Sequence, residues 1–255
     1  MYLELKNLHK RFDKELVVDD LNLSLEKGQL LCILGGSGCG KTTTLNMIGG
    51  FLTPDAGTIH LDGVDITNLP PERRPVATVF QSYGLFPHMT VLQNVIYGLK
   101  FKGYKKADAI KKGHQYLEMV GLQDYANAYP HEISGGMLQR AGVIRAMVHD
   151  PEILLMDEPY GALDELTREQ MNMELLDIWS KTKKTIIFIT HNIEEAVLLS
   201  DKVYVMGTHP GRLVEVVDLE LERPRQLSMI TQPKFIGYRQ YLESAIGEID
   251  LSKIK

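Results

Sequence analysis

Polar and hydrophobic residues alternate near the start of the chain, first at Leu3 and Leu5 and then through residues 21–25. A period of two is typical of half-buried β-strands, because successive side chains of a strand point to opposite faces. A Glu-Lys-Gly turn follows at residues 26–28. The pattern predicts an antiparallel β-structure at the N-terminus.

Residues 30–34 are apolar without alternation, and a glycine-rich loop and a helical pattern follow them. A continuous apolar run is expected of a strand buried on both faces. Further strands are predicted at residues 58–61, 76–80, 153–156, 185–189 and 202–206. Helices are predicted between the later strands, and this order is typical of a largely parallel sheet covered by helices.

The strand pattern is absent from residues 88–150, where three helical segments are predicted instead. One of them starts after Ser134 and has an apolar face formed by Met137, Ala141, Ile144 and Val148. Towards the C-terminus the sequence predicts a turn at residues 208–211, a strand at 213–217 and a helix at 233–246.

We therefore expect one domain over residues 1–255, of the α/β class. Its core, formed by residues 1–87 and 151–230, contains the mostly parallel sheet and an N-terminal antiparallel β subdomain. An all-helical subdomain, residues 88–150, is inserted into that core, and residues 231–255 form a C-terminal helix. The chain offers no repeat or low-complexity segment.

Composition narrows the possible functions. With 44% hydrophobic and 24% charged residues, the chain has the make-up of an ordinary globular protein, and its apolar runs are far shorter than the roughly 18 residues of a membrane span. The N-terminus lacks the features of a secretory signal, and two cysteines are too few for a disulfide framework. A net charge of −5 with interspersed signs argues against nucleic acid as a partner. We expect a cytoplasmic protein.

Residues 35–42, GGSGCGKT, match the pattern G-x-x-x-x-G-K-[ST] between a buried strand and a helix. Glycines let backbone N–H groups wrap a phosphate chain, and the positive end of the following helix adds to the attraction. Lys41 is expected to reach the β- and γ-phosphates, and the Thr42 hydroxyl to ligate Mg²⁺. Cys39 is interpreted as a passive loop residue, with a thiolate stabilised by the helix terminus as the alternative.

Two acids, Asp157 and Glu158, end the strand predicted at residues 153–156. Ligands of parallel sheets bind beyond the carboxyl ends of the strands, where the glycine-rich loop also lies. Because side chains alternate along a strand, Asp157 can face a magnesium ion while Glu158 polarises an attacking water. The alternative is a solvated turn that opens at Pro159.

Two further polar residues follow predicted strands in the same way. His191 could donate a hydrogen bond to a γ-phosphate, and Gln81 could join the shell of the metal or the water. A structural histidine is the alternative for His191 when it is taken alone. Four strands that deliver polar groups to one edge are stronger evidence than any single residue.

Ser134, Gly135 and Gly136 open the helix of the inserted segment, and the serine is a natural N-cap. A serine and two glycines before a helix can form a second anion site, although a plain capped helix is the alternative. One phosphate loop and one remote phosphate-capping helix fit half of a two-fold dimer, in which each ATP lies between two chains.

Along nearly its whole length the sequence resembles the ABC (ATP-binding cassette) transporter ATPase family. Residues 35–42 are similar to its Walker A motif, 133–137 to its signature, 153–158 to Walker B and 161–164 to its D-loop, while Gln81 and His191 stand at the Q-loop and switch positions. The resemblance implies a P-loop NTPase core that binds ATP and Mg²⁺.

The resemblance also implies a set of site residues. Phe12 matches the family's aromatic that stacks on adenine, with a core phenylalanine as the alternative. The catalytic residues would be Glu158, His191 and Gln81, and the magnesium ligands Thr42, Gln81 and Asp157. The nucleotide-binding residues would be Phe12, Gly35, Gly36, Ser37, Gly38, Cys39, Gly40, Lys41, Thr42, Thr43, Ser134, Gly135, Gly136 and Asp164.

The signature departs from the family's usual Leu-Ser-Gly-Gly-Gln at Ile133 and Met137. A methionine at the last position, the Pro-Gly-Arg turn at 210–212 and the segment 221–225 resemble importers of nitrate, sulfonate and taurine. Residues 70–74 and 80–88 look equally like polyamine or iron importer ATPases. We place the chain closest to the first group and keep the second as the alternative.

As the resemblance implies, two ATPase subunits close around two Mg-ATP and move separate transmembrane permease subunits, with an external solute-binding protein as an indirect partner. The second subunit is another copy or a related ATPase, and the chain lies peripherally on the inner face of the membrane. Residues Tyr83, Leu85, Phe86 and Met89 are a hypothetical dock for the permease, with core packing as the alternative. A non-transport ABC ATPase, such as an assembly scaffold, and a P-loop kinase or GTPase are less favoured interpretations.

Overall fold

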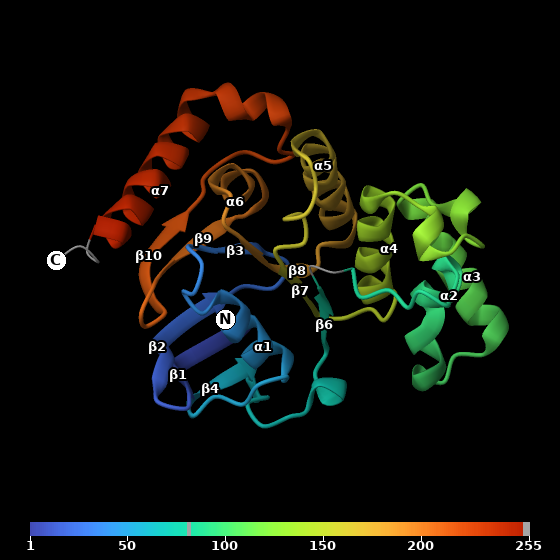
Figure 1. Ribbon diagram of the computed structural model, residues 1–255, viewed down its shortest axis with the longest axis horizontal. Coiled ribbons are helices and arrows are strands. Elements are labelled where there is room, and N and C mark those ends of the chain that lie inside the picture. Colours follow the sequence, from blue (N-terminus) through green and yellow to red (C-terminus); the bar gives the residue numbers. More distant parts are fainter. Residues whose placement is uncertain (81–82, 252–255) are drawn as a thin grey trace.

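Two β-sheets form the centre of the molecule, and helices cover them (Figure 1). The structure is a computed structural model, and it describes residues 1–80 and 83–251. A group of helices projects from one side of the sheets, at the end of the long axis opposite the C-terminal helix (Figure 1). The predicted α/β class with an inserted helical region is confirmed.

The first sheet is antiparallel and belongs to the N-terminal region. In spatial order its strands are β2 (Glu15–Leu25), β1 (Leu3–Phe12), β4 (Ala56–Leu61) and β5 (Val64–Asp65). Leu3 pairs with Leu25 and Leu5 with Leu23, and all four side chains are buried. The alternation of the first 25 residues therefore predicted both the strands and their buried face.

The second sheet has six strands, and all of its neighbouring pairs except β10–β9 are parallel. In spatial order they are β10 (Arg212–Asp218), β9 (Lys202–Gly207), β3 (Leu30–Gly35), β8 (Thr185–Thr190), β7 (Ile153–Asp157) and β6 (Val76–Val79). The strand predicted at residues 58–61 does not join it. That strand is β4, which pairs antiparallel with β1, and the short turn after it joins it to β5.

The helices fall into three groups. Those against the two sheets are α1 (Lys41–Gly49), α5 (Glu165–Thr182) and α6 (Ile193–Leu199). Those of the projecting group are α2 (Val91–Ile96), α3 (Lys106–Met119) and α4 (Gly135–Met147), and α7 (Pro233–Leu251) lies at the C-terminal end. Short 3₁₀ helices are η1 (Pro71–Arg73), η2 (Tyr97–Lys102), η3 (Gln123–Tyr125), η4 (Pro130–Glu132) and η5 (Leu227–Thr231).

Strand β3 separates two hydrophobic cores. Leu30 and Leu34 face the core shared with the projecting helices, whereas Leu31 and Ile33 face the core shared with the antiparallel sheet and α1. Every residue of β3 is buried, as the continuous apolar run predicted. Among the helices that the structure describes, none combines the length and the apolar character needed to cross a bilayer.

Helix α4 confirms the predicted apolar face. Ala141 and Ile144 are fully buried in the core, and so is Val148 at the C-cap. Met137 packs against the same core while partly exposed. This apolar face thus packs α4 against the edge of the sheet.

Arg74 secures the C-terminal end of α1. Its guanidinium is 6% exposed and donates hydrogen bonds to the carbonyl oxygens of Met47 and Ile48 at 2.7 and 2.8 Å. It also donates to the carbonyls of Leu69 and Thr67, each at 2.8 Å. One buried cation therefore supplies charged donors to carbonyls at the helix end and ties the helix to the loop before β6.

Replacing this cation should destabilise the fold. We expect Arg74→Ala to lower the free energy of unfolding by about 3 kcal/mol, because buried carbonyls lose charge-assisted donors. Urea denaturation followed by circular dichroism measures the change. The neighbouring Arg73 is exposed, so Arg73→Ala should stay within about 0.5 kcal/mol of the parent; equal losses in the two variants would contradict this role.

Candidate functional site

The glycine-rich loop connects the end of β3 to the start of α1, as predicted. Gly38 and Gly40 have φ angles of 77° and 82°, which L side chains rarely adopt. A Cβ added at Gly36 or Gly38 would meet no atom within 4 Å, so the backbone there borders open space. A Cβ at Gly40 would lie 2.9 Å from Val18 Cγ2. Gly38 and Gly40 therefore meet a conformational need of the backbone, and Gly36 and Gly38 leave the backbone open to a ligand.

Helix α1 begins directly at this loop. Gly40 is its N-cap and has no side chain, so the first N–H groups of the helix receive no side-chain cap. Uncapped amides and the helix dipole attract an anion of phosphate size. These amides open into a cavity of about 420 Å³, which Ser37, Thr42 and Thr43 also line.

Lys41 places its ammonium group at the floor of this cavity. The side chain is 7% exposed, and Nζ donates to the carbonyl oxygens of Gly35 and Gly36 at 2.8 and 2.9 Å. Nζ also lies 3.9 Å from Glu158 Oε1. The loop therefore holds a desolvated positive charge where the triphosphate of a nucleotide would carry its negative charge.

Strand β7 brings Asp157 to the start of α1. The Thr42 hydroxyl donates to Asp157 Oδ1 at 3.2 Å. Burial raises the pKa of the Asp157 carboxyl and the negative charge of Glu158 adds to the rise, while the hydrogen bond from Thr42 opposes it. The Thr42 hydroxyl and the Asp157 carboxylate are adjacent oxygen ligands of the kind that Mg²⁺ prefers. Because burial disfavours the negative charge of Asp157, a bound cation would stabilise it, so this pair fits Mg²⁺.

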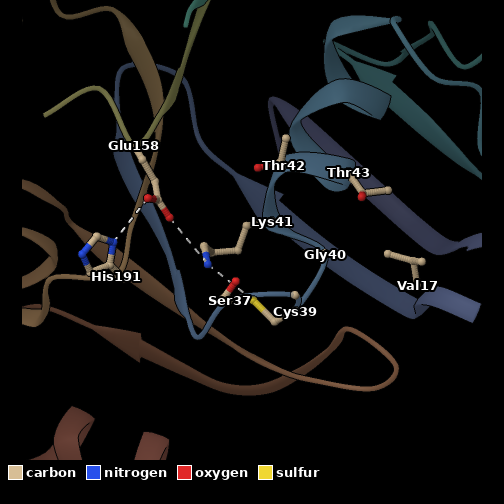
Figure 2. Close-up of a pocket in the computed structure, with 10 residues that line it drawn as sticks. Val17, Ser37, Cys39, Gly40, Lys41, Thr42, Thr43, Glu158 and His191 are labelled. Carbon is tan, nitrogen blue, oxygen red and sulfur yellow. Dashed lines mark hydrogen bonds and ion pairs between the residues drawn. The ribbon is translucent and has the colours of Figure 1, made fainter. Parts of the chain in front are cut away.

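Glu158 lies between the lysine and a histidine. Its φ of 42° is in the left-handed region, where the chain turns away from β7. Figure 2 shows the carboxylate between Lys41 and His191, whose Nδ1 is 3.3 Å from Glu158 Oε2. Side chains from β7, β8 and α1 thus meet at one cavity, and the interpretation of the two acids as a solvated turn is wrong.

The turn that carries His191 rests on a buried acid. Thr190 Oγ1 donates to Glu195 Oε2 at 2.5 Å and accepts from the N–H of Asn192 at 3.0 Å. Glu195 is 5% exposed, and burial raises the pKa of its carboxyl. Its partner on the other side is Arg168 at 3.9 Å. This network positions the histidine, and a strand-by-strand analysis of the sequence did not identify it.

Cys39 is buried below the loop. Its side chain is 0% exposed, and burial raises the pKa of the thiol although Lys41 Nζ lies 3.7 Å from the sulfur. The thiol therefore stays protonated near neutral pH, which favours the passive interpretation over the thiolate.

Two residues of the site escaped the sequence analysis. Val17 on β2 lines the cavity. Gly211 packs on the outer side of the loop, where an added Cβ would lie 2.2 Å from the Cys39 carbonyl oxygen, and its N–H donates to the Val17 carbonyl at 2.8 Å. The Pro-Gly pair before Arg212 was a signal for a tight turn, but no sequence pattern indicates what that turn contacts.

A second cavity, of about 520 Å³, lies at the start of α4. Ser134, Gly135, Gly136 and Asp164 line it. Ser134 Oγ accepts from the N–H of the residue three positions on at 3.4 Å, so the predicted cap is confirmed. Among the described residues, none lines both cavities. One chain therefore does not bring the serine to the phosphate loop, in keeping with a site shared by two chains.

The remaining predicted residues have different outcomes. Asp164 caps α5 by accepting from the N–H of Thr167 at 3.0 Å. Phe12 ends β1 with 44% of its surface exposed, so the alternative of a core phenylalanine is wrong, and adenine stacking stays a prediction. Gln81, predicted as a catalytic residue and metal ligand, lies outside the described residues.

Comparison with known proteins agrees with this geometry. The family model described as "ABC transporter" matches residues 18–161. An uncharacterised ABC transporter ATP-binding protein of Methanocaldococcus jannaschii is 42% identical over 257 residues, which cover 99% of this chain and 94% of that protein.

Two further similarities bear on function. The spermidine/putrescine import ATP-binding protein PotA of Nitrosomonas europaea is 50% identical over 205 residues, which cover 80% of this chain and 57% of that relative. The chain thus matches little more than half of PotA. A solved dimeric ATP-binding cassette in a post-hydrolysis state, bound to ADP and Pi, has a TM-score of 0.75 at 29% identity and covers 86% of this chain and 100% of its own.

The half-buried carboxylate of Asp157 should lower the stability of the folded, nucleotide-free protein. Because the fold raises the pKa of Asp157, the folded state prefers the protonated carboxyl, and stability falls as the pH rises through that pKa. We expect Asp157→Asn to raise the melting temperature of the nucleotide-free protein at neutral pH by roughly 2–4 °C. The gain should shrink as the pH is lowered, and scanning calorimetry at several pH values measures it.

Asp164→Asn is the matched control. Hydrogen bonds from Thr167 lower the pKa of Asp164, so its charge is favourable in the folded protein and its loss should not raise the melting temperature. A gain from Asp164→Asn as large as that from Asp157→Asn, or a loss from Asp157→Asn at neutral pH, would show that desolvation of Asp157 is not the cause.

Proposed function

Because this chain belongs to the ABC transporter ATPase family, we propose that it energises a membrane importer of a small solute by hydrolysing ATP. The observation that carries the proposal is the position of Glu158, 3.9 Å from Lys41 Nζ and 3.3 Å from His191 Nδ1 above the phosphate loop. A carboxylate flanked by a cation and an imidazole beside the phosphate site is the arrangement needed to activate water.

In the proposed mechanism, the amides of α1 and the ammonium of Lys41 bind the β- and γ-phosphates and neutralise developing charge. Thr42 and Asp157 would hold Mg²⁺, which when bound supplies positive charge to the phosphate oxygens. Glu158 accepts the proton of the attacking water at a carboxylate oxygen. His191 orients that carboxylate and donates a hydrogen bond towards the γ-phosphate.

The family's subunits dimerise and work with permease subunits, and we propose that each ATP here lies between two chains. The separation of the two cavities supports this arrangement, since Ser134 and the phosphate loop line different ones. Closure would bring the signature serine and glycines of one chain over the nucleotide held by the other.

We propose that the permease docks beside the loop after β6. A groove of about 210 Å³ separates β6 from α4 there, and Phe80, Tyr83 and Arg145 line it. Tyr83, Leu85, Phe86 and Met89 are half-buried, so the condition that would have excluded the dock, full burial, is not met. Docking there would place the chain peripherally on the inner face of the membrane.

Asn94 gives this loop its shape. Its side chain is 0% exposed, and its amide donates to the carbonyls of Phe86, Met89 and Thr90 at 3.0–3.1 Å. Asn94 Oδ1 accepts from the N–H of Phe86 at 2.7 Å. A rigid loop of this kind can transmit the movement of α4 to a docked partner.

Two observations bear on the transported solute, and they favour different compounds. The 50% identity to PotA supports a polyamine. Met137 and the Pro-Gly-Arg turn supported an importer of nitrate, sulfonate or taurine. However, Gly211 of that turn packs against the phosphate loop, so its presence is explained by packing and says little about the solute. We therefore propose a polyamine importer first and a sulfonate-type importer second.

The catalytic assignment predicts a separation of binding from turnover. Glu158→Gln should retain ATP binding yet hydrolyse ATP at least about a hundredfold more slowly, because the amide cannot accept the proton of water. Steady-state phosphate release and equilibrium nucleotide binding measure the two quantities. Glu72→Gln, an exposed residue of η1, is the control and should hydrolyse ATP at the parent rate. Near-normal turnover by Glu158→Gln would remove Glu158 from the role.

The solute assignment predicts which compound stimulates the assembled transporter. Co-purified with its permease and reconstituted with its binding protein, the complex should hydrolyse ATP several-fold faster with putrescine or spermidine than with taurine or nitrate. Stimulation by taurine alone would favour the sulfonate group. Failure to co-purify with any permease would favour an assembly scaffold.

A further inference from the structure

The segment between Tyr97 and Lys112 carries a charge opposite to that of the whole chain. It contains six lysines and one aspartate, in a protein with a net charge of −5. The segment comprises η2, the turn after it and the first half of α3, at the outer end of the projecting helices (Figure 1). We call it the lysine surface, and its six lysines are Lys100, Lys102, Lys105, Lys106, Lys111 and Lys112.

Within residues 1–80 and 83–251, these lysines form no ion pair. In the part of the chain that the structure describes, none of the six has a carboxylate oxygen within 4.0 Å, whereas seven other lysines have one. The sole acid of the segment, Asp108, is exposed in the first turn of α3. Lys102 and Lys112 help to lower the pKa of the Asp150 carboxyl, and Lys102 donates to the His149 carbonyl at 2.7 Å. The positive charge available for a partner is therefore mainly that of Lys100, Lys105, Lys106 and Lys111.

Aromatic rings lie among the lysines and point outward. Phe101 is 73% exposed and Tyr104 is 41% exposed. Lys100 Nζ lies 3.9 Å from the ring centroid of Tyr97 and 4.6 Å from that of Phe101, so cation and ring form one patch. Leaving Phe101 in water is unfavourable, and an exposed aromatic amid lysines marks a contact surface rather than a solvated face.

We propose that the lysine surface binds the anionic phospholipid headgroups of the membrane that holds the permease. Lysines attract a negatively charged bilayer surface, at about fivefold in affinity for each lysine close to it. Aromatic rings prefer the headgroup region, where their edges enter the apolar boundary. Lysine stems reach towards that boundary while their ammonium groups stay at the phosphates.

The position of the surface favours lipid over other polyanions. Tyr97 and Gly98, at its start, line the same groove as Phe80 and Tyr83, so the surface continues the proposed permease dock. A chain docked there would carry this surface next to the membrane that holds the permease. That step rests on the proposed function, but binding of lipid by the free chain does not. A nucleic acid is disfavoured because the rest of the chain is acidic and would repel a long polyanion.

Vesicle co-sedimentation of the full chain tests the proposal, with phosphatidylcholine vesicles that contain or lack phosphatidylglycerol. We expect binding to the anionic vesicles, weakened by added salt, and little binding to the neutral ones. The triple variant K105Q/K106Q/K111Q, at three exposed positions, should bind the anionic vesicles on the order of a hundredfold more weakly. Phe101→Ser should weaken binding several-fold at every salt concentration.

The matched control is K6Q/K14Q/K27Q, which removes the same charge from an exposed position of β1 and from the exposed turns before and after β2. It should bind vesicles like the parent. Equal binding to both kinds of vesicle, an equal loss in the two triple variants, or binding of a single-stranded oligonucleotide without binding of vesicles would each overturn the proposal. ATP hydrolysis, measured on the same samples, should be unchanged in both triple variants, which separates failure of this inference from failure of the ATPase assignment.

Discussion

The parallel register of β3, β8 and β7 is the constraint on which the site depends. Leu34 pairs with Thr190, and Asp157 pairs with Ile189, so the carboxyl ends of the three strands reach the same edge of the sheet. The loop before Lys41, the acids at the end of β7 and His191 directly after β8 are therefore brought together although they are distant in the sequence. A slip of one residue would turn every side chain of a strand to the other face and separate these groups.

The second feature of the site is that several of its charged side chains are largely shielded from water. The ammonium of Lys41 is held by loop carbonyls, the pKa of Asp157 is raised by burial, and Glu195 below them is also buried with a raised pKa. A nucleotide would supply the opposite charge to Lys41 and a cation the opposite charge to Asp157, whereas Glu195 has Arg168 at 3.9 Å as its partner within the chain. Binding of Mg-nucleotide would relieve the unfavourable charges of Lys41 and Asp157, so the subunit is expected to be more stable with its nucleotide than without it.

The two ends of the molecule are proposed to face different partners. We propose that the phosphate loop and the signature cavity face a second ATPase subunit, whereas the groove beside β6 and the lysine surface face the permease and its membrane. Helix α4 belongs to both sides, since Ser134 opens it and Arg145 lines the groove near its end. A shift of this helix on closure around ATP would therefore move Arg145 and change the shape of the groove. In the proposed function, α4 would be the rigid element that couples hydrolysis to transport.

The sequence by itself determined the strands of both sheets except the two-residue β5, together with the helical insertion and the phosphate loop, because these depend on local periodicity and on glycine conformation. It also identified Asp157, Glu158 and His191, since polar residues after buried strands of a parallel sheet meet at one edge. Only the tertiary structure decided that the strand at residues 58–61 pairs with β1, that Gly211 supports the phosphate loop and that Glu195 supports the turn of His191. Those contacts join residues distant in the chain, or depend on which neighbours are buried together, and no local pattern records them.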